Sequence, residues 1–106
     1  MPWILVAVAG LLEVCWAYFM KQSAGFTRLW PTFLTIVTMV ASFGLLSVAM
    51  RVLPLGTAYM VWTGIGALGA FIVGVVVLGE PVGLLRILAA ALILSGIVVM
   101  KAASGE

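Results

Sequence analysis

Glu13 is the side chain in this sequence best placed to do chemistry, because it lies near the centre of a long apolar run. No lysine or arginine lies at a comparable depth to pair with it. A lone carboxylate at such a depth costs about 3 kcal/mol or more, and acids of this kind are usually functional. The acid either stays protonated or holds a cation in a polar cavity. Alternation between these states predicts exchange of protons for cations; the simpler alternative is a neutral acid bonded to a neighbouring helix.

The neighbours of Glu13 on its own predicted helix fit a binding site. Gly10 and Trp16 lie three positions before and after it, so they share its helix face. Gly10 leaves room beside the carboxyl group. Trp16 offers an indole N–H donor or an aromatic face for a cation.

Two further polar stripes occur at helical spacing. Ser42 ends one of them and lies about as deep as Glu13, while Tyr59 and Trp62 are able to donate to the carboxylate from another side. For the hydroxyl groups the alternative is a bond to their own helix. For the aromatic residues it is a place in the interfacial belt, which suits Trp3 and Trp30. The two stripes consist of Thr35, Thr38 and Ser42, and of Tyr59, Trp62 and Gly66.

The composition shows what must position these residues. The 106 residues are 66% hydrophobic and 8% charged, with a mean hydropathy of +1.39, whereas a soluble domain is about 25% charged. This excludes an ordinary cytosolic enzyme and a nucleic-acid-binding domain. There is no histidine and a single cysteine, Cys15, so neither an internal disulfide nor a metal site is supported. No nucleophile–base pair is present either, which argues against an enzyme.

The charged residues divide the chain into four apolar lengths, each near the roughly 20 residues that a spanning helix needs. We predict an all-α membrane protein, one transmembrane domain over residues 1–106, with spans at about 2–20, 32–50, 56–78 and 85–101. A cleavable signal peptide is not expected, because the first span lacks a basic leading region and three more spans follow.

The basic residues are balanced between the two predicted ends of the bundle. Arg51 and Lys101 lie on the side of the chain termini, and Lys21, Arg28 and Arg86 lie on the other side. Because orientation normally follows a Lys/Arg excess in cytoplasmic loops, we expect insertion in both orientations and an antiparallel dimer. A single topology set by one residue is the alternative. Four helices are too few to enclose a pathway, and Ala89 and Gly96 share a face that allows close helix packing, at a dimer contact or within the subunit.

A segment from Gly64 to Gly69 formally matches the dinucleotide-binding pattern. That pattern requires a preceding strand and a turn into a soluble helix, whereas this segment lies inside a predicted span. Gly64 and Gly66 are better explained by close packing or by a bend in the helix.

The motifs resemble the small multidrug resistance family, and within it the guanidinium-exporter subtype. The resemblance covers essentially the whole chain. It rests on Gly10-Leu11-Leu12-Glu13-Val14-Cys15-Trp16-Ala17 in the first span, on Lys21, Ser23, Gly25-Phe26-Thr27-Arg28 and Pro31 after it, and on Pro54-Leu55-Gly56-Thr57-Ala58-Tyr59 and Trp62-Thr63-Gly64-Ile65-Gly66 in the third.

The resemblance implies four transmembrane helices per subunit in an antiparallel, dual-topology homodimer of the bacterial inner membrane. It implies proton-coupled antiport that exports guanidinium, driven by the proton gradient without a cofactor or metal. Glu13 would bind protons or substrate, Ser42 and Trp62 would orient its carboxylate, and Tyr59, Trp16 and Gly10 would line the site. By the same resemblance, Gly64 and Gly66 match a helix bend, and Ala89 and Gly96 match a dimer seam.

Met60, Cys15 and Tyr18 depart from the family pattern, and Met60 bears on how widely the site opens toward lipid and so on substrate range. The nearest alternative within the family is export of quaternary ammonium or other bulky cations, which Gly10 and Trp16 disfavour. An alternative of another class is a non-transporting subunit of a heterodimeric membrane complex, which the buried Glu13 disfavours.

Overall fold

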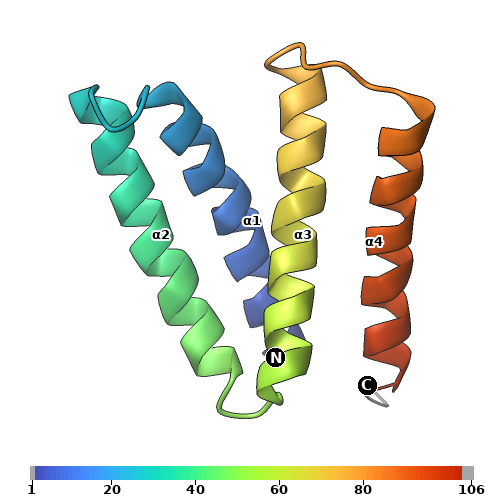
Figure 1. Cartoon of the computed structure of the whole chain (residues 1–106). Helices are drawn as coiled ribbons and strands as arrows, with labels where there is room; N and C mark the ends of the chain where they lie inside the picture. The colour runs from blue at the N-terminus through green and yellow to red at the C-terminus, as the bar shows by residue number, and fades with distance from the viewer. Residues whose placement is uncertain (1, 104–106) are drawn as a thin grey trace.

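Four helices make up the described part of the chain, residues 2–103, in a computed structural model (Figure 1). They are α1 (Pro2–Gln22), α2 (Leu29–Ala49), α3 (Leu55–Val76) and α4 (Leu84–Ala103). Each is long and apolar enough to cross a membrane. Together with the absence of strands between residues 2 and 103, this confirms the predicted all-α membrane class. The dimer stays a prediction.

The helix ends differ from the predicted spans for local reasons. α2 begins at Leu29 rather than at about residue 32, because Pro31 falls in its first turn, where a missing N–H costs nothing. α3 ends at Val76, and Gly79 then adopts a φ of +69°. This left-handed residue turns the chain back, so that the Glu80 N–H donates to the Gly74 carbonyl at 2.9 Å.

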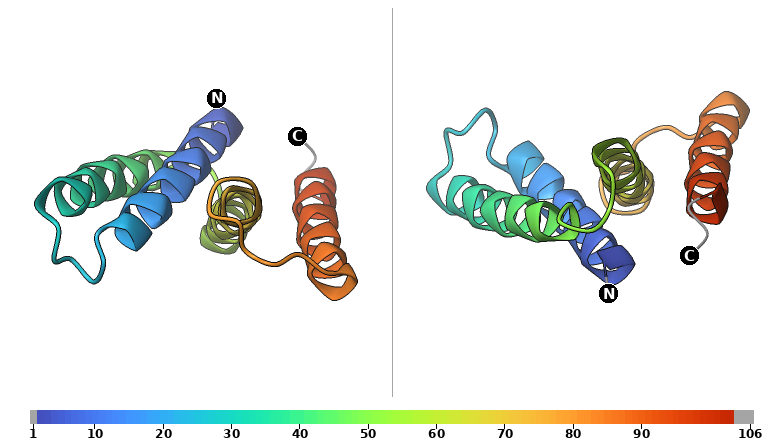
Figure 2. Two further views of the ribbon diagram at one scale, coloured as in Figure 1. Left: turned by 90° about the horizontal axis from the view of Figure 1, so that it is seen from above. Right: turned by 90° about the horizontal axis from the view of Figure 1, so that it is seen from below.

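The four helices lie in a single open layer and do not form a closed bundle. The Cα positions extend over 43 × 35 × 16 Å. α1 packs on both α2 and α3, α2 approaches α3 over a short stretch, and α4 packs mainly against α3 (Figure 2). The small apolar core therefore lies where α1, α2 and α3 meet. Its buried members are Val6, Ala9, Leu46, Ala49, Leu53, Ala58, Val61 and Trp62.

Both described ends of the chain lie at the same end of the molecule, as four antiparallel spans require (Figure 1). The Lys101 ammonium group there lies 5.1 Å from the centre of the Trp3 ring, a cation–π contact that links the end of α4 to the beginning of α1. The turns after α1 and α3 lie at the opposite end.

Candidate cation-binding site

Two polar atoms at the middle of α1 are buried without a hydrogen-bond partner. They are Oε1 of Glu13 and Nε1 of Trp16. The residues are one helical turn apart and both are partly buried. Buried polar atoms are nearly always paired in folded proteins, and an exception calls for an explanation such as a ligand. One acceptor and one donor therefore remain available in the same region of α1.

Glycines bring α1 and α3 close together at this level. A Cβ atom on Gly10 would lie 2.6 Å from Cγ2 of Ile65, so only a glycine allows the present approach. Three residues along α1, the carboxylate of Glu13 lies directly against the backbone of α3 at Gly66, where a Cβ atom would overlap it. The two helices thus meet at the acid itself.

Ser42 joins three helices through two hydrogen bonds. Its hydroxyl group donates to the Ala9 carbonyl of α1 at 2.7 Å and accepts the indole N–H of Trp62, from α3, at 3.0 Å. Ser42 is fully buried and Trp62 nearly so. This arrangement differs from the one that the resemblance implies, because neither donor is directed to the carboxylate of Glu13. Ser42 and Trp62 instead bond to each other and to the α1 backbone.

The other hydroxyl groups of the α2 stripe bond to their own helix. Thr35 donates to the Pro31 carbonyl and Thr38 to the Leu34 carbonyl, each at 2.7 Å. This is the alternative that the sequence left open for them. Ser42 is the member of the stripe that bonds to another helix.

An aromatic row connects α1, α2 and α3. Phe43 makes edge-to-face contacts with Trp16 (ring centres 6.3 Å apart) and with Trp62 (5.7 Å), and Tyr59 packs on Trp62 at 5.5 Å. Three of these rings, those of Trp16, Tyr59 and Trp62, are among the site residues predicted from the sequence, and Phe43 is not. The available signal was its position directly after Ser42. The row begins at Trp16, one helical turn from Glu13, and supplies several π-faces, each able to attract a cation through the ring quadrupole.

An open groove of about 430 Å³ lies between α2 and α3, with Tyr59 and Trp62 in its wall. Phe43 borders the same groove, and the remaining lining is apolar apart from Ser47. Tyr59 is half exposed. The aromatic side of the site is therefore open laterally within one chain.

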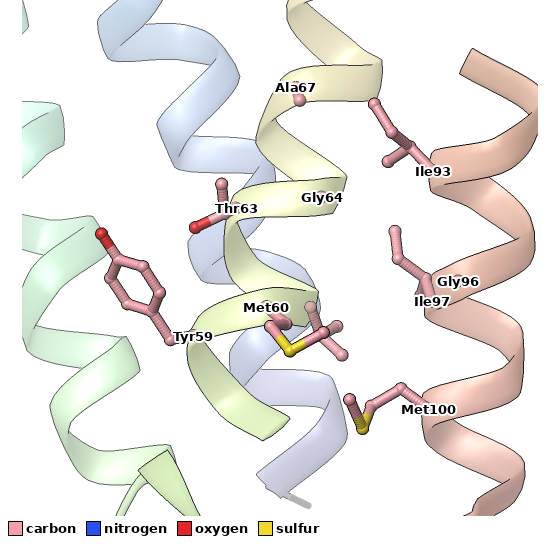
Figure 3. Close-up of a pocket in the computed structure, with 10 residues that line it drawn as sticks. Tyr59, Met60, Thr63, Gly64, Ala67, Ile93, Gly96, Ile97 and Met100 are labelled. Carbon is pink, nitrogen blue, oxygen red and sulfur yellow. The ribbon is translucent and has the colours of Figure 1, made fainter. Parts of the chain in front are cut away.

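A second groove, of about 390 Å³, lies between α3 and α4 (Figure 3). Met60 and Gly96 line it, and Ile97 of α4 points toward Gly64, where a Cβ atom would lie 2.8 Å from its Cδ1. Met60 therefore lies on the α4 side of α3, away from the groove that Phe43 borders.

The residues predicted to bend α3 and to pack the dimer are placed as follows. α3 is one unbroken helix through Gly64 and Gly66. Ala89 and Gly96 are both exposed beside α3, Ala89 on a separate small groove with Arg86. Their predicted role between subunits stays a prediction. Within residues 2–103, no three His, Cys, Asp or Glu side chains gather where they could hold a metal ion.

The fold and the site are those of a membrane protein with four spans, in which two buried polar atoms of α1 lack hydrogen-bond partners. A family model described as "Small Multidrug Resistance protein" matches residues 1–93. The chain belongs to the small multidrug resistance family, a family of transporters and not of enzymes, and is accordingly a multi-pass protein of the bacterial inner membrane.

Similar curated proteins bear a more specific name. A protein of Yersinia pseudotuberculosis named "Guanidinium exporter" is 57% identical over 104 residues, which cover 98% of this chain and all of that protein. A protein of the same name from Proteus vulgaris is 52% identical over the same coverage. A third, from Salmonella typhimurium, is 54% identical over 101 residues, 95% of this chain and 96% of that protein.

Proposed function

We propose that this chain exports guanidinium in exchange for protons, as an antiparallel homodimer in which each subunit contributes one Glu13. The observation that carries the proposal is the pair of buried, unpartnered atoms, Oε1 of Glu13 and Nε1 of Trp16. The names of relatives at 52–57% identity support the choice of cation.

The chemistry of guanidinium suits this site. The ion is planar, and its N–H groups can meet the two oxygens of a carboxylate side by side. The rings of Trp16 and Tyr59 offer π-faces to the same cation. The apolar surroundings keep water away and strengthen each of these interactions.

Proton coupling follows from competition for one group. The Glu13 carboxyl group can hold a proton or pair with a cation, but not both. If the empty, charged site does not cross the membrane, each guanidinium that leaves requires protons to enter. Two such acids facing one cavity would titrate as a coupled pair.

A second copy would complete what one chain leaves open. One subunit is a single layer about 16 Å thick and does not surround a pathway. The nearly equal numbers of basic residues at its two ends favour a partner of opposite orientation. α4, which has no buried residue, offers a surface for the partner.

The test is transport by the purified chain alone in liposomes under an imposed pH gradient. We expect guanidinium to move in exchange for protons, and Glu13→Gln to abolish the movement while the variant still assembles. Acidifying the side from which guanidinium binds should weaken its uptake, because protonation removes the negative charge that the cation needs.

A tetraalkylammonium ion in the same liposomes separates the alternatives. Movement of only this bulky cation would place the chain among drug exporters. No movement of either ion by well-folded protein would contradict the proposal and indicate a different partner chain or an assembly role.

A further inference from the structure

The Glu13 carboxylate is held in place by packing against α3 and not by hydrogen bonds. Its Oε1 atom is buried without a partner, and the donors of Ser42 and Trp62 are engaged elsewhere. What it meets is the α3 backbone at Gly66. A Cβ atom there would overlap the carboxylate and lie 2.8 Å from Cγ of Glu13.

We propose that Gly66 is a positioning residue, whose bare backbone seats the Glu13 carboxylate where it can receive both N–H groups of a planar cation. This inference rests on the proposed function, because it explains how the exporter holds its acid. It also gives Gly66 a role other than a helix bend.

The exact position of the Glu13 carboxylate matters more for binding guanidinium than for binding a proton. Charge-assisted N–H···O bonds span about 2.7–2.9 Å, so a carboxylate displaced by an ångström cannot keep two of them to one planar ion. A proton bonds to either oxygen and requires no such alignment. A change at Gly66 should therefore weaken guanidinium binding and leave protonation of Glu13 possible.

Other glycines of α3 supply matched controls. The missing side chain of Gly64 faces Ile97 and Ile93 of α4, and that of Gly69 faces Val14 of α1. Gly69 lies at the same α1–α3 contact as Gly66, and the atom nearest to its missing Cβ is about as close but belongs to Val14 and not to the acid. Each Gly→Ala change brings the same gain in helix propensity, about 1 kcal/mol, so differences between them report on what each Cβ atom strikes.

The experiment compares guanidinium/proton exchange in liposomes for the natural chain and for the G66A, G64A, G69A and G44A variants. Gly44, on α2, has nothing within 4 Å of a Cβ atom, so G44A should transport normally. We expect G66A to raise the KM for guanidinium by about tenfold or more, since it displaces the group that binds the cation. G69A and G64A should change the KM far less.

Proton binding gives the second measurement. The tryptophan fluorescence of purified protein, titrated with pH, should keep its Glu13-dependent transition in G66A and lose it in E13Q. Equal increases of KM in G66A and G69A would show that separation of the helices is responsible and would overturn the proposal. A normal KM in G66A, or equal effects of G64A and G66A, would also overturn it.

A double-mutant cycle covers the case in which G66A folds poorly. In E13D the side chain is shorter by one methylene group and withdraws the carboxylate from Gly66. G66A should therefore lower the melting temperature less in the E13D background than in the natural chain. An equal drop in both backgrounds would refute the proposal that the Gly66 backbone positions the carboxylate. This cycle needs no transport, so failure of guanidinium transport by the natural chain would refute the proposed function without deciding the role of Gly66.

Discussion

At the scale of single residues, Ser42 connects three of the four helices. Its one hydroxyl group satisfies the indole of α3 and a carbonyl of α1 while belonging to α2. For Ser42 or Trp62 to turn toward Glu13, this pair of bonds has to open. A turn of either donor toward the acid would thus loosen the contact among the three helices.

Replacing Ser42 with alanine should destabilise the fold. The change leaves the buried N–H of Trp62 without an acceptor, which costs about 1–3 kcal/mol. The loss should appear as a lower melting temperature in detergent. Ser95→Ala is the control, because Ser95 is exposed and bonds only to the Ala91 carbonyl of its own helix. Equal melting temperatures for the two variants would contradict this reading.

Residue type and spacing were enough to select much of the centre of the molecule. Glu13 and Trp16 were identified from the depth of the acid in an apolar span, and the structure places both of their unpartnered atoms in the interior. The contact of Phe43 with two tryptophans and the packing of Glu13 on Gly66 were not predictable in this way. Both depend on how helices cross, and periodicity within one helix carries no information about that.

At the scale of elements, the turn after α1 is more tightly built than its length suggests. Ala24, Gly25 and Phe26 all have positive φ, at 50°, 76° and 66°. Buried Ser23 fixes them: its hydroxyl group donates to the Met20 carbonyl at 2.6 Å and accepts the Phe26 N–H at 3.0 Å. Since α1 also packs closely on α2, the turn and the helix contact together hold these two helices to each other.

Two glycine substitutions should have opposite effects on stability. A Cβ atom meets nothing within 4 Å at Gly25 or at Gly44, so backbone conformation alone decides. Gly25→Ala places alanine at a left-handed φ and should cost about 1–2 kcal/mol. Gly44→Ala, inside α2, should gain up to about 1 kcal/mol. Thermal unfolding of both variants in one detergent measures the signs, and stabilisation by Gly25→Ala would contradict the described turn.

The number and type of the elements were predictable, since four apolar lengths separated by charges and prolines leave few choices. Their ends were less so, as the early start of α2 at Leu29 shows. The open arrangement was not predictable at all. Short connections require antiparallel neighbours but do not say whether α4 closes against α1 or lies outside α3.

At the scale of the whole molecule, the two ends carry similar charge. The turns after α1 and α3, with Lys21, Arg28 and Arg86 in or near them, lie at one end, and Arg51 and Lys101 lie at the other with the chain termini. Because the basic residues are so evenly divided between the two ends, a change of one charge can decide the orientation in which the chain inserts.

Replacing a single basic residue with an uncharged one should therefore shift the proportions of the two orientations. Arg51→Gln leaves one basic side chain at the end with the termini and should place that end outside the cell more often. Arg86→Gln should act in the opposite sense. Reporter fusions at the C-terminus, active on one side of the membrane or the other, measure the proportions, with Gln22→Asn as a control of unchanged charge. Identical proportions in all three variants would contradict a balanced topology.

The exposure of α4 has a consequence for how the protein is handled. This helix has no buried residue and packs mainly against α3 (Figure 2). If a second copy covers it, the strength of the assembly depends on how many chains share an area of bilayer, as for any association governed by mass action. Dilution with added lipid, at constant temperature and pH, should then detach copies from one another while α1, α2 and α3 stay packed. Any activity that requires the assembly would then fall as the lipid-to-protein ratio rises.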